Sequence, residues 1–134
     1  MISKLIRAAA VVAVAALVSA AAPVQAHSVA RPQGGAYYLE VAFDDGPRYD
    51  AVLTCPDGRT HPRGPRACDQ LAAVDGDIGS IRWAGTVCTT EHRPVTVRAH
   101  GVWEGRYRHY RGRFGNLCTA VSYTGGHVFA IAER

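Results

Sequence analysis

Cysteines and histidines are the side chains of this sequence with the widest chemical use, and their spacing does not predict a metal site. The 134-residue chain has four cysteines and six histidines. Neighbouring cysteines have 12, 19 and 29 residues between them, whereas structural zinc sites take ligands in closely spaced pairs. His100 and His109 can face each other across a hairpin, but scattered, solvated histidines explain the pattern better. We therefore expect neither a metal nor another cofactor.

Nucleophilic catalysis has the necessary residue types here but no supporting pattern. Ser80, Ser122, the histidines and the acidic residues nominally supply every member of a serine triad. Neither serine lies in a G-x-S-x-G sequence or a comparable local signature. The sequence also has no paired-carboxylate pattern and no glycine-rich phosphate loop. It therefore does not indicate an enzyme.

One short segment has the residues to hold a single extended shape. Its sequence is Val87-Cys88-Thr89-Thr90-Glu91-His92-Arg93-Pro94. Cys88 can tie it to a distant element, while Pro94 fixes its own φ and favours an extended backbone at Arg93. A serine protease binds an extended peptide in its cleft, and a segment that is already ordered loses little entropy on binding. The segment predicts protease inhibition; an ordinary polar hairpin loop beside a disulfide is the alternative.

A basic stretch nearer the C-terminus supports a different interpretation. Arginines alternate with aromatic residues in Arg106-Tyr107-Arg108-His109-Tyr110-Arg111-Gly112-Arg113. Such a strand can bind nucleic acid through its phosphates and stacked bases. It can also be a solvated strand whose arginine stems cover apolar surface. Predicted export and a low net charge favour the solvated strand, so we expect no nucleic-acid partner.

The N-terminus has the three parts of a secretory signal peptide. Lys4 and Arg7 form a basic region, residues 8–22 form an apolar run, and Val24-Gln25-Ala26 is a cleavage site. The apolar run is shorter than the ~20 residues that span a membrane, so we expect no membrane anchor. Residues 1–26 are thus predicted to be removed, which leaves a secreted domain of residues 27–134. Loss of Lys4 and Arg7 lowers the formal net charge from +4 to +2.

All four cysteines lie in the part that is predicted to be exported, which indicates two disulfides. Four cysteines allow three pairings. We favour Cys55–Cys68 with Cys88–Cys118, because the first bridge closes a short loop rich in proline and glycine. In the chain-entropy model the two bridges contribute about 3 and 3.7 kcal/mol. That is a large share of the stability of a small domain.

Strands and two short helices must position these residues. The expected strands, separated by turn signals such as Asp44-Asp45-Gly46-Pro47, are Ala36–Phe43, Tyr49–Thr54, Val95–Trp103, Arg106–Phe114 and His127–Ala132. Pro56–Pro65 has the composition of a loop, Ala67–Val74 that of a short helix ending near Gly76, and residues 115–126 contain a second helix. Because the strands do not alternate with helices, we predict an α+β fold, with a five-stranded antiparallel sheet covered on one face by two short helices.

Many of these pieces, in this order, resemble the subtilisin inhibitor family of actinomycetes. The matching stretches include all four cysteines and extend from about residue 51 to residue 131. They are Leu53-Thr54-Cys55-Pro56, Gly58, Thr60-His61-Pro62, Ala67-Cys68-Asp69-Gln70-Leu71-Ala72-Ala73-Val74-Asp75-Gly76-Asp77, Cys88–Pro94, Val95-Thr96-Val97, Gly101-Val102-Trp103-Glu104-Gly105, Phe114-Gly115-Asn116-Leu117-Cys118 and Val128-Phe129-Ala130.

The resemblance implies a fold and a quaternary structure. Members of this family have a five-stranded antiparallel sheet with two helices. Their disulfides join the first cysteine to the second and the third to the fourth, and they usually form homodimers through their sheets. We therefore expect a subtilisin-inhibitor-like domain over residues 27–134, with Cys55–Cys68 and Cys88–Cys118 bridges, and a homodimer.

The resemblance also implies a mechanism. The loop enters the cleft of a subtilisin-like serine protease as a substrate does, and cleavage is slow and readily reversed. Carried onto this sequence, the reactive bond is Thr90–Glu91, and Thr90 is the primary specificity residue. Val87 and Thr89 then occupy acyl-side subsites, and His92 lies on the leaving side. The residues expected to contact the protease around this bond are Val87, Cys88, Thr89, His92 and Arg93.

Two further positions are implied to support the loop. Asn116 matches the family asparagine that props the reactive loop from behind, and an amide can donate and accept hydrogen bonds together. A plain turn residue in Gly115-Asn116 is the alternative. Pro94 stiffens the end of the loop.

The chain departs from the family pattern at the reactive bond. Members commonly carry Met, Lys or Arg in place of Thr90, often Pro in place of Thr89, and an apolar residue in place of Glu91. We expect a secreted, homodimeric inhibitor of subtilisin-like serine proteases. The departures leave a second interpretation, in which the same scaffold inhibits serine proteases weakly and serves another exported protease or a cross-linking reaction.

Overall fold

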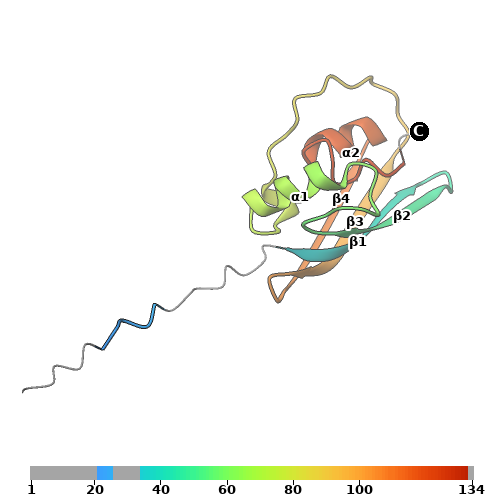
Figure 1. Cartoon of the computed structure of the whole chain (residues 1–134). Helices are drawn as coiled ribbons and strands as arrows, with labels where there is room; N and C mark the ends of the chain where they lie inside the picture. Colours follow the sequence, from blue (N-terminus) through green and yellow to red (C-terminus); the bar gives the residue numbers. More distant parts are fainter. Residues whose placement is uncertain (1–20, 26–33, 133–134) are drawn as a thin grey trace, which may run out of the picture. The chain divides into compact units, whose positions relative to one another are not determined.

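The computed structural model describes residues 21–25 and 34–132 (Figure 1). The chain divides into two units, residues 1–30 and 31–134, and the elements below belong to the second. Most of the predicted signal peptide lies outside the described residues; its residues 21–25 form neither helix nor strand. In the part of the chain that is described, no helix has the length and apolar character to cross a membrane.

Four antiparallel strands form one sheet in the order β2-β1-β3-β4. The strands agree with the predicted ranges to within one residue: β1 (Gly35–Phe43), β2 (Arg48–Thr54), β3 (Val95–Trp103) and β4 (Arg106–Phe114). β1 and β3 are the central strands, and their pairing brings Val41 opposite Val97. The α+β fold with an antiparallel sheet is therefore confirmed.

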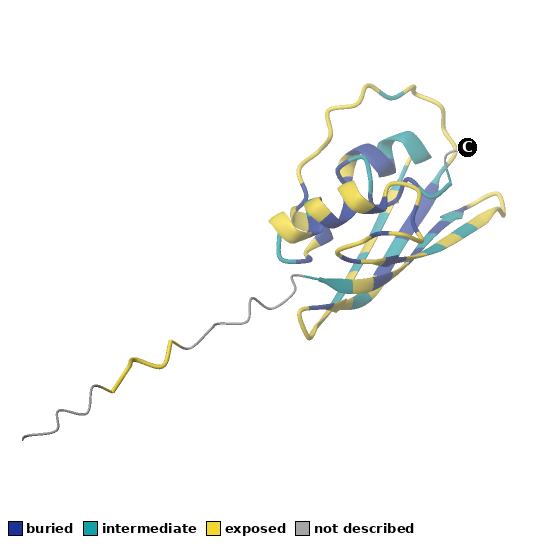
Figure 2. Cartoon of the chain, in the orientation of Figure 1, coloured by how far each residue is buried: buried dark blue, intermediate teal, exposed yellow. Residues whose placement is uncertain are grey.

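The two faces of the sheet differ because successive side chains of a strand point to opposite sides. One face carries Tyr37, Leu39 and Val41 of β1 and Val97 and Trp103 of β3, each at most 1% exposed. The helices cover this face, and the buried residues lie between the helices and the sheet (Figures 1 and 2). Among the described residues, no helix or loop covers the opposite face (Figure 1).

Helix α1 (Gly64–Ala73) packs on the sheet through Ala67, Cys68 and Leu71. It begins three residues before the predicted start, because Pro65 fits the first turn of a helix, where its missing N–H is not needed. The predicted loop over Pro56–Pro65 is therefore wrong in its last two residues. The helix ends as expected near Gly76, whose N–H donates to the carbonyl of Leu71 at 2.8 Å.

Helix α2 (Leu117–Tyr123) supplies the second predicted helix. The side chain of Asn116 begins it by accepting a hydrogen bond from the N–H of Thr119 at 2.8 Å. Between α1 and the loop that follows lies a 3-10 turn, η1 (Ile78–Ser80). The carboxylate of Asp77 begins that turn by accepting from the N–H of Gly79. Both short elements are thus started by a side chain that satisfies a free backbone donor.

The predicted fifth strand at His127–Ala132 is wrong, and the sheet has four strands within the described part of the chain. Residues 124–131 form consecutive turns. Val128, Phe129 and Ala130 are all at most 2% exposed, whereas neighbouring residues of a strand point to opposite faces. Phe129 packs against Tyr110 of β4, with ring centroids 5.9 Å apart. The apolar run is buried by turns instead of by strand pairing.

Candidate functional site

The segment over residues 82–94 joins η1 to β3 as a long arch beyond α2 (Figure 1). It contains no helix or strand, and it is exposed along almost its whole length (Figure 2). Val87 is 95% exposed, and Thr90, Glu91 and His92 are exposed as well. A segment without regular backbone pairing needs other contacts to keep one shape.

The first of these contacts is a disulfide. Cys88 in the loop is bonded to Cys118 in α2, with Cα atoms 5.7 Å apart. The second bridge, Cys55–Cys68, ties the end of β2 to α1 across 5.4 Å between Cα atoms. Both predicted pairings are confirmed. Cys88–Cys118 therefore fastens the arch to the helix beneath it.

Asn116 makes the second contact, from the start of α2. Its Nδ2 donates to the carbonyl oxygens of Thr89 at 3.1 Å and Glu91 at 2.9 Å. These residues flank Thr90, so one buried amide binds the backbone on both sides of the predicted reactive position. Because its Oδ1 also accepts from Thr119 at 2.8 Å, Asn116 has more contacts than a plain turn residue.

Hydrogen bonds at Arg93 and Pro94 fix the end of the loop. The N–H of Arg93 donates to the carbonyl of Gly115 at 2.9 Å, and Pro94 accepts from the N–H of Asp44 at 3.0 Å. The Arg93 guanidinium donates to Asp45 at 2.8 and 3.4 Å, and this hydrogen bonding raises the pKa of Arg93. The Arg93 side chain is held against the turn between β1 and β2 and is still 43% exposed; its contact with a protease stays a prediction.

Trp83 and Ser122 support the beginning of the loop, a role that was not predicted from the sequence. Ser122 was considered there only as a nucleophile, yet it is 2% exposed. Its Oγ accepts from the indole N–H of Trp83 at 2.8 Å and from the N–H of Thr86 at 3.2 Å. The only hint in the sequence is Trp83 itself, a large aromatic residue in a stretch without helix or strand pattern.

The histidine pair and the basic strand have simpler surroundings. His100 and His109 lie opposite each other in β3 and β4, as predicted, and His100 packs against Tyr38 with ring centroids 5.2 Å apart. Among the described residues, no three His, Cys, Asp or Glu side chains are grouped as metal ligands. Three arginines of β4 are paired with acids: Arg106 and Arg108 with Asp75, and Arg113 with Asp44.

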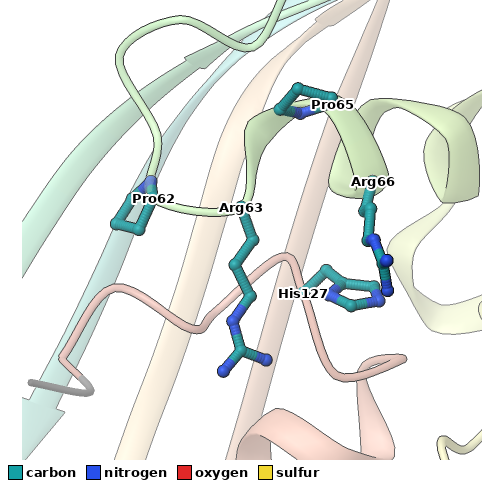
Figure 3. A pocket seen from close by; sticks show the side chains of 5 residues that line it. All are labelled: Pro62, Arg63, Pro65, Arg66 and His127. Atoms are coloured by element: carbon teal, nitrogen blue, oxygen red, sulfur yellow. The ribbon is translucent and has the colours of Figure 1, made fainter.

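A surface pocket of about 440 Å³ lies elsewhere, at the start of α1 (Figure 3). Burial, followed by the charges of Arg63 and Arg66, lowers the pKa of His127 in its wall. Arg63 also donates to the carbonyl of Gly126 at 2.8 Å. The residues lining this pocket are Pro62, Arg63, Pro65, Arg66 and His127, and none of them belongs to the loop.

Comparisons with known proteins agree with these features. A family model described as subtilisin inhibitor-like matches residues 40–116, which include the whole loop and Asn116. A Streptomyces avermitilis protein named "Putative serine protease inhibitor" is 41% identical over 127 residues, 93% of this chain and 86% of that protein. A protease inhibitor of Streptomyces netropsis is 42% identical over 85 residues, 60% of this chain and 77% of that protein.

A solved structure is similar in fold as well. It is the complex of sermetstatin from Streptomyces caespitosus with subtilisin from Bacillus licheniformis. The TM-score is 0.52 at 27% identity, and the match covers 70% of this chain and 94% of that one. From the matched family region and these relatives, we conclude that the chain belongs to the subtilisin inhibitor-like family.

Proposed function

We propose that this protein inhibits subtilisin-like serine proteases by offering its loop as a slowly cleaved substrate with Thr90–Glu91 as the reactive bond. The observation that carries the proposal is the pair of hydrogen bonds from Asn116 to Thr89 and Glu91. The Cys88–Cys118 bridge adds a covalent support two residues before Thr90. Related chains named as protease inhibitors, and one solved in complex with subtilisin, support the same function.

These contacts explain how cleavage is reversed. When the protease serine attacks the carbonyl carbon of Thr90, an acyl-enzyme forms and the amine of Glu91 is released. The leaving side stays in place because Asn116 binds the Glu91 carbonyl at 2.9 Å and Arg93 is bonded to Gly115. The amine therefore remains beside the acyl group at a high effective concentration, and the bond re-forms. A substrate without such support loses its leaving group to solvent.

An inhibition titration against subtilisin, trypsin, chymotrypsin and elastase tests the proposal. Thr90 is small and uncharged, so we expect the tightest inhibition with subtilisin, weaker inhibition with elastase and almost none with trypsin. Mass spectrometry after long incubation should find the only slow cut at Thr90–Glu91. A lack of inhibition of all four enzymes, or rapid cleavage at another bond, would contradict the proposal. Inhibition of a different exported protease alone would favour the second interpretation above.

We also infer that the protein is secreted and dimeric. The sequence of residues 1–26 supports export, and intact mass of the secreted product should show an N-terminus at or near His27. Support for a homodimer comes from the uncovered face of the sheet. Large apolar side chains are exposed there by 39 to 68%: Tyr38, Val52, Val102 and Tyr107. They lie in register on neighbouring strands, with Tyr38 opposite Val52 and Val102 opposite Tyr107.

A further inference from the structure

We propose that Ser122 is a positioning residue, which fixes the acyl side of the loop and thereby holds Val87 in place for the protease. This inference rests on the proposed function. It adds a support at the beginning of the loop to those that Asn116 and the disulfide give near the reactive bond. It also gives Trp83 a role, because the indole N–H of Trp83 donates to the Ser122 hydroxyl.

Ser122 binds the loop with both its backbone and its side chain. Its carbonyl accepts from the N–H of Ala84 at 2.8 Å. Its Oγ accepts from the N–H of Thr86 at 3.2 Å and from the indole of Trp83 at 2.8 Å. The two bonds use both acceptor positions of the hydroxyl. Because Ser122 is 2% exposed, water competes little for these bonds.

Gly85 allows both backbone donors to reach one residue. It lies between Ala84 and Thr86 and has a φ of +75°, a conformation that glycine adopts far more readily than other residues. A Cβ added at this position would meet no atom within 4 Å. The glycine is therefore required by the backbone conformation and not by crowding. This turn directs the chain from Ser122 towards Cys88.

Helix α2 thus binds the loop at three successive points. Asn116 precedes the helix, while Cys118 and Ser122 are four residues apart and lie on the same face of it. Four residues correspond to a rise of about 6 Å along the helix axis. The disulfide and the serine therefore hold neighbouring parts of the loop above one rigid surface.

Val87 lies between the two points that Ser122 and Cys118 fix. Thr86 is hydrogen-bonded to Ser122, and Cys88 is covalently bonded to Cys118. Val87 is 95% exposed, so the described residues cover almost none of its side chain. Its direction is therefore set by its neighbours' backbone. If Ser122 releases Thr86, Val87 loses one of the two anchors that flank it.

Amide exchange in the free protein tests the anchor without a protease. Ser122→Ala should speed hydrogen exchange at Thr86 on the order of tenfold, because the N–H loses its acceptor. The control is Thr124→Val, which removes another buried hydroxyl at the same end of α2. That hydroxyl bonds only the helix carbonyls of Ala120 and Val121, so Thr86 should exchange at the wild-type rate. Equal exchange in both variants would overturn the proposed anchor.

Measurements of subtilisin inhibition and of loop cleavage test how the Ser122 anchor affects function. Ser122→Ala should raise both the inhibition constant against subtilisin and the rate of cleavage at Thr90–Glu91 by roughly tenfold, with Thr124→Val near wild type. If Ser122→Ala does not fold, Trp83→Phe replaces it, because it removes only the indole donor of an exposed side chain and keeps the ring near Tyr123. It should give a smaller change in the same direction.

A double-mutant cycle separates positioning from a general loss of stability. Val87→Ala should weaken inhibition in the wild type and weaken it less in the Ser122→Ala background, since a released Val87 contributes less. Equal losses in both backgrounds would overturn the positioning role even if Ser122→Ala binds poorly. A wild-type protein that inhibits no serine protease would instead refute the proposed function, while the exchange measurement would still report on the anchor.

Discussion

The side chain of Asn116 contacts both the helix and the loop, and it uses a different amide atom for each. Oδ1 accepts from Thr119 at the start of α2, whereas Nδ2 donates to Thr89 and Glu91. Asn116→Asp keeps an acceptor for the helix and removes the donors to the loop. If the loop needed Asn116 only to begin α2, the Asn116→Asp variant would resist cleavage as the wild type does.

We therefore predict that Asn116→Asp and Asn116→Ala both turn the protein towards a substrate. Losing a buried hydrogen-bond partner costs about 1–3 kcal/mol, which should appear as faster cleavage at Thr90–Glu91 during incubation with subtilisin. Asn116→Asp should retain more thermal stability than Asn116→Ala, because the helix keeps its N-cap. If Asn116→Asp resists cleavage like the wild type, the loop does not depend on the Nδ2 bonds.

Thr90 sets the choice of protease in the proposed mechanism. Its side chain offers little apolar area to a roomy subtilisin pocket, and each added methylene in such a pocket contributes about 0.8 kcal/mol. Thr90→Met and Thr90→Leu should tighten subtilisin inhibition by roughly one to two orders of magnitude, since ~1.4 kcal/mol is tenfold. Thr90→Arg should create inhibition of trypsin. Inhibition constants that do not respond to any of the three would place the reactive bond elsewhere.

His61 couples stability to pH. It is 6% exposed, its Nδ1 accepts from the N–H of Arg63 at 3.0 Å, and its Nε2 lies 2.8 Å from the carbonyl of Val128. These contacts fix a neutral ring that donates from Nε2. Protonation of Nδ1 would break one bond and place a charge in the core, and burial accordingly lowers the pKa of His61.

The direction of the pH effect follows from that lowered pKa. The unfolded chain takes up a proton near pH 6.5 while the folded protein does not, so the free energy of unfolding is greatest above that pH and decreases as the pH falls below it. Urea unfolding between pH 7.5 and 5.5 measures the decrease. In His61→Gln the free energy of unfolding should depend less on pH. In His127→Gln most of the pH dependence should remain, although the pKa of His127 is lowered too. If the free energy of unfolding of His61→Gln depends on pH as in the wild type, other groups cause the pH dependence.

At the scale of elements, local patterns sufficed for the strands and the disulfides but not for the end of the chain. Exposure alternates along most of β1, β2 and β4, and such alternation is a local property of the sequence. The run from Val128 to Ala130 is equally apolar but is buried through turns that follow Gly125 and Gly126, both with positive φ. Composition alone does not distinguish a buried turn from a buried strand.

The candidate site was predictable to a similar, partial degree. Asn116 lies two residues before Cys118, so a short matching stretch places it at the loop once the bridge is known. Trp83 and Ser122 are 39 residues apart, and nothing local to either predicts their contact. That contact depends on where α2 lies over the sheet, which is a result of the whole fold.

The turns over residues 124–131 bury two neighbouring apolar side chains, and both should contribute to stability. Val128 and Phe129 are both fully buried, so truncation of either should destabilise the protein. We expect Phe129→Ala to cost about 3–5 kcal/mol and Val128→Ala roughly 2 kcal/mol, measured by denaturant unfolding. Val87→Ala, at a side chain 95% exposed, is the control and should stay within about 0.5 kcal/mol of wild type. If residues 127–132 formed a strand instead, Val128 and Phe129 would point to opposite faces, and one of the two substitutions would cost little.

At the scale of the whole molecule, the helices and the loop lie on one side of the sheet, and no other described element covers the opposite side (Figure 1). The loop and the uncovered face therefore do not compete for the same surface. Two copies that pair through their sheets would each keep a loop available, so a dimer should bind two protease molecules. The uncovered face also carries charge pairs, with Glu40 bonded to both Arg48 and Arg98 at 2.6 Å.

One added charge on the uncovered face tests the proposed dimer. Val102 is 46% exposed beside Tyr107, so Val102→Glu should place an unpaired carboxylate in the proposed dimer interface and shift the protein to monomers. Ala72→Glu, on the exposed side of α1, adds the same charge away from that face and should remain dimeric. Sedimentation measures the assembly, and titration with subtilisin should show one protease per chain in both variants. A monomeric wild type, or a dimeric Val102→Glu protein, would exclude pairing through this face, while loss of inhibition in the monomer would show that the loop depends on the dimer.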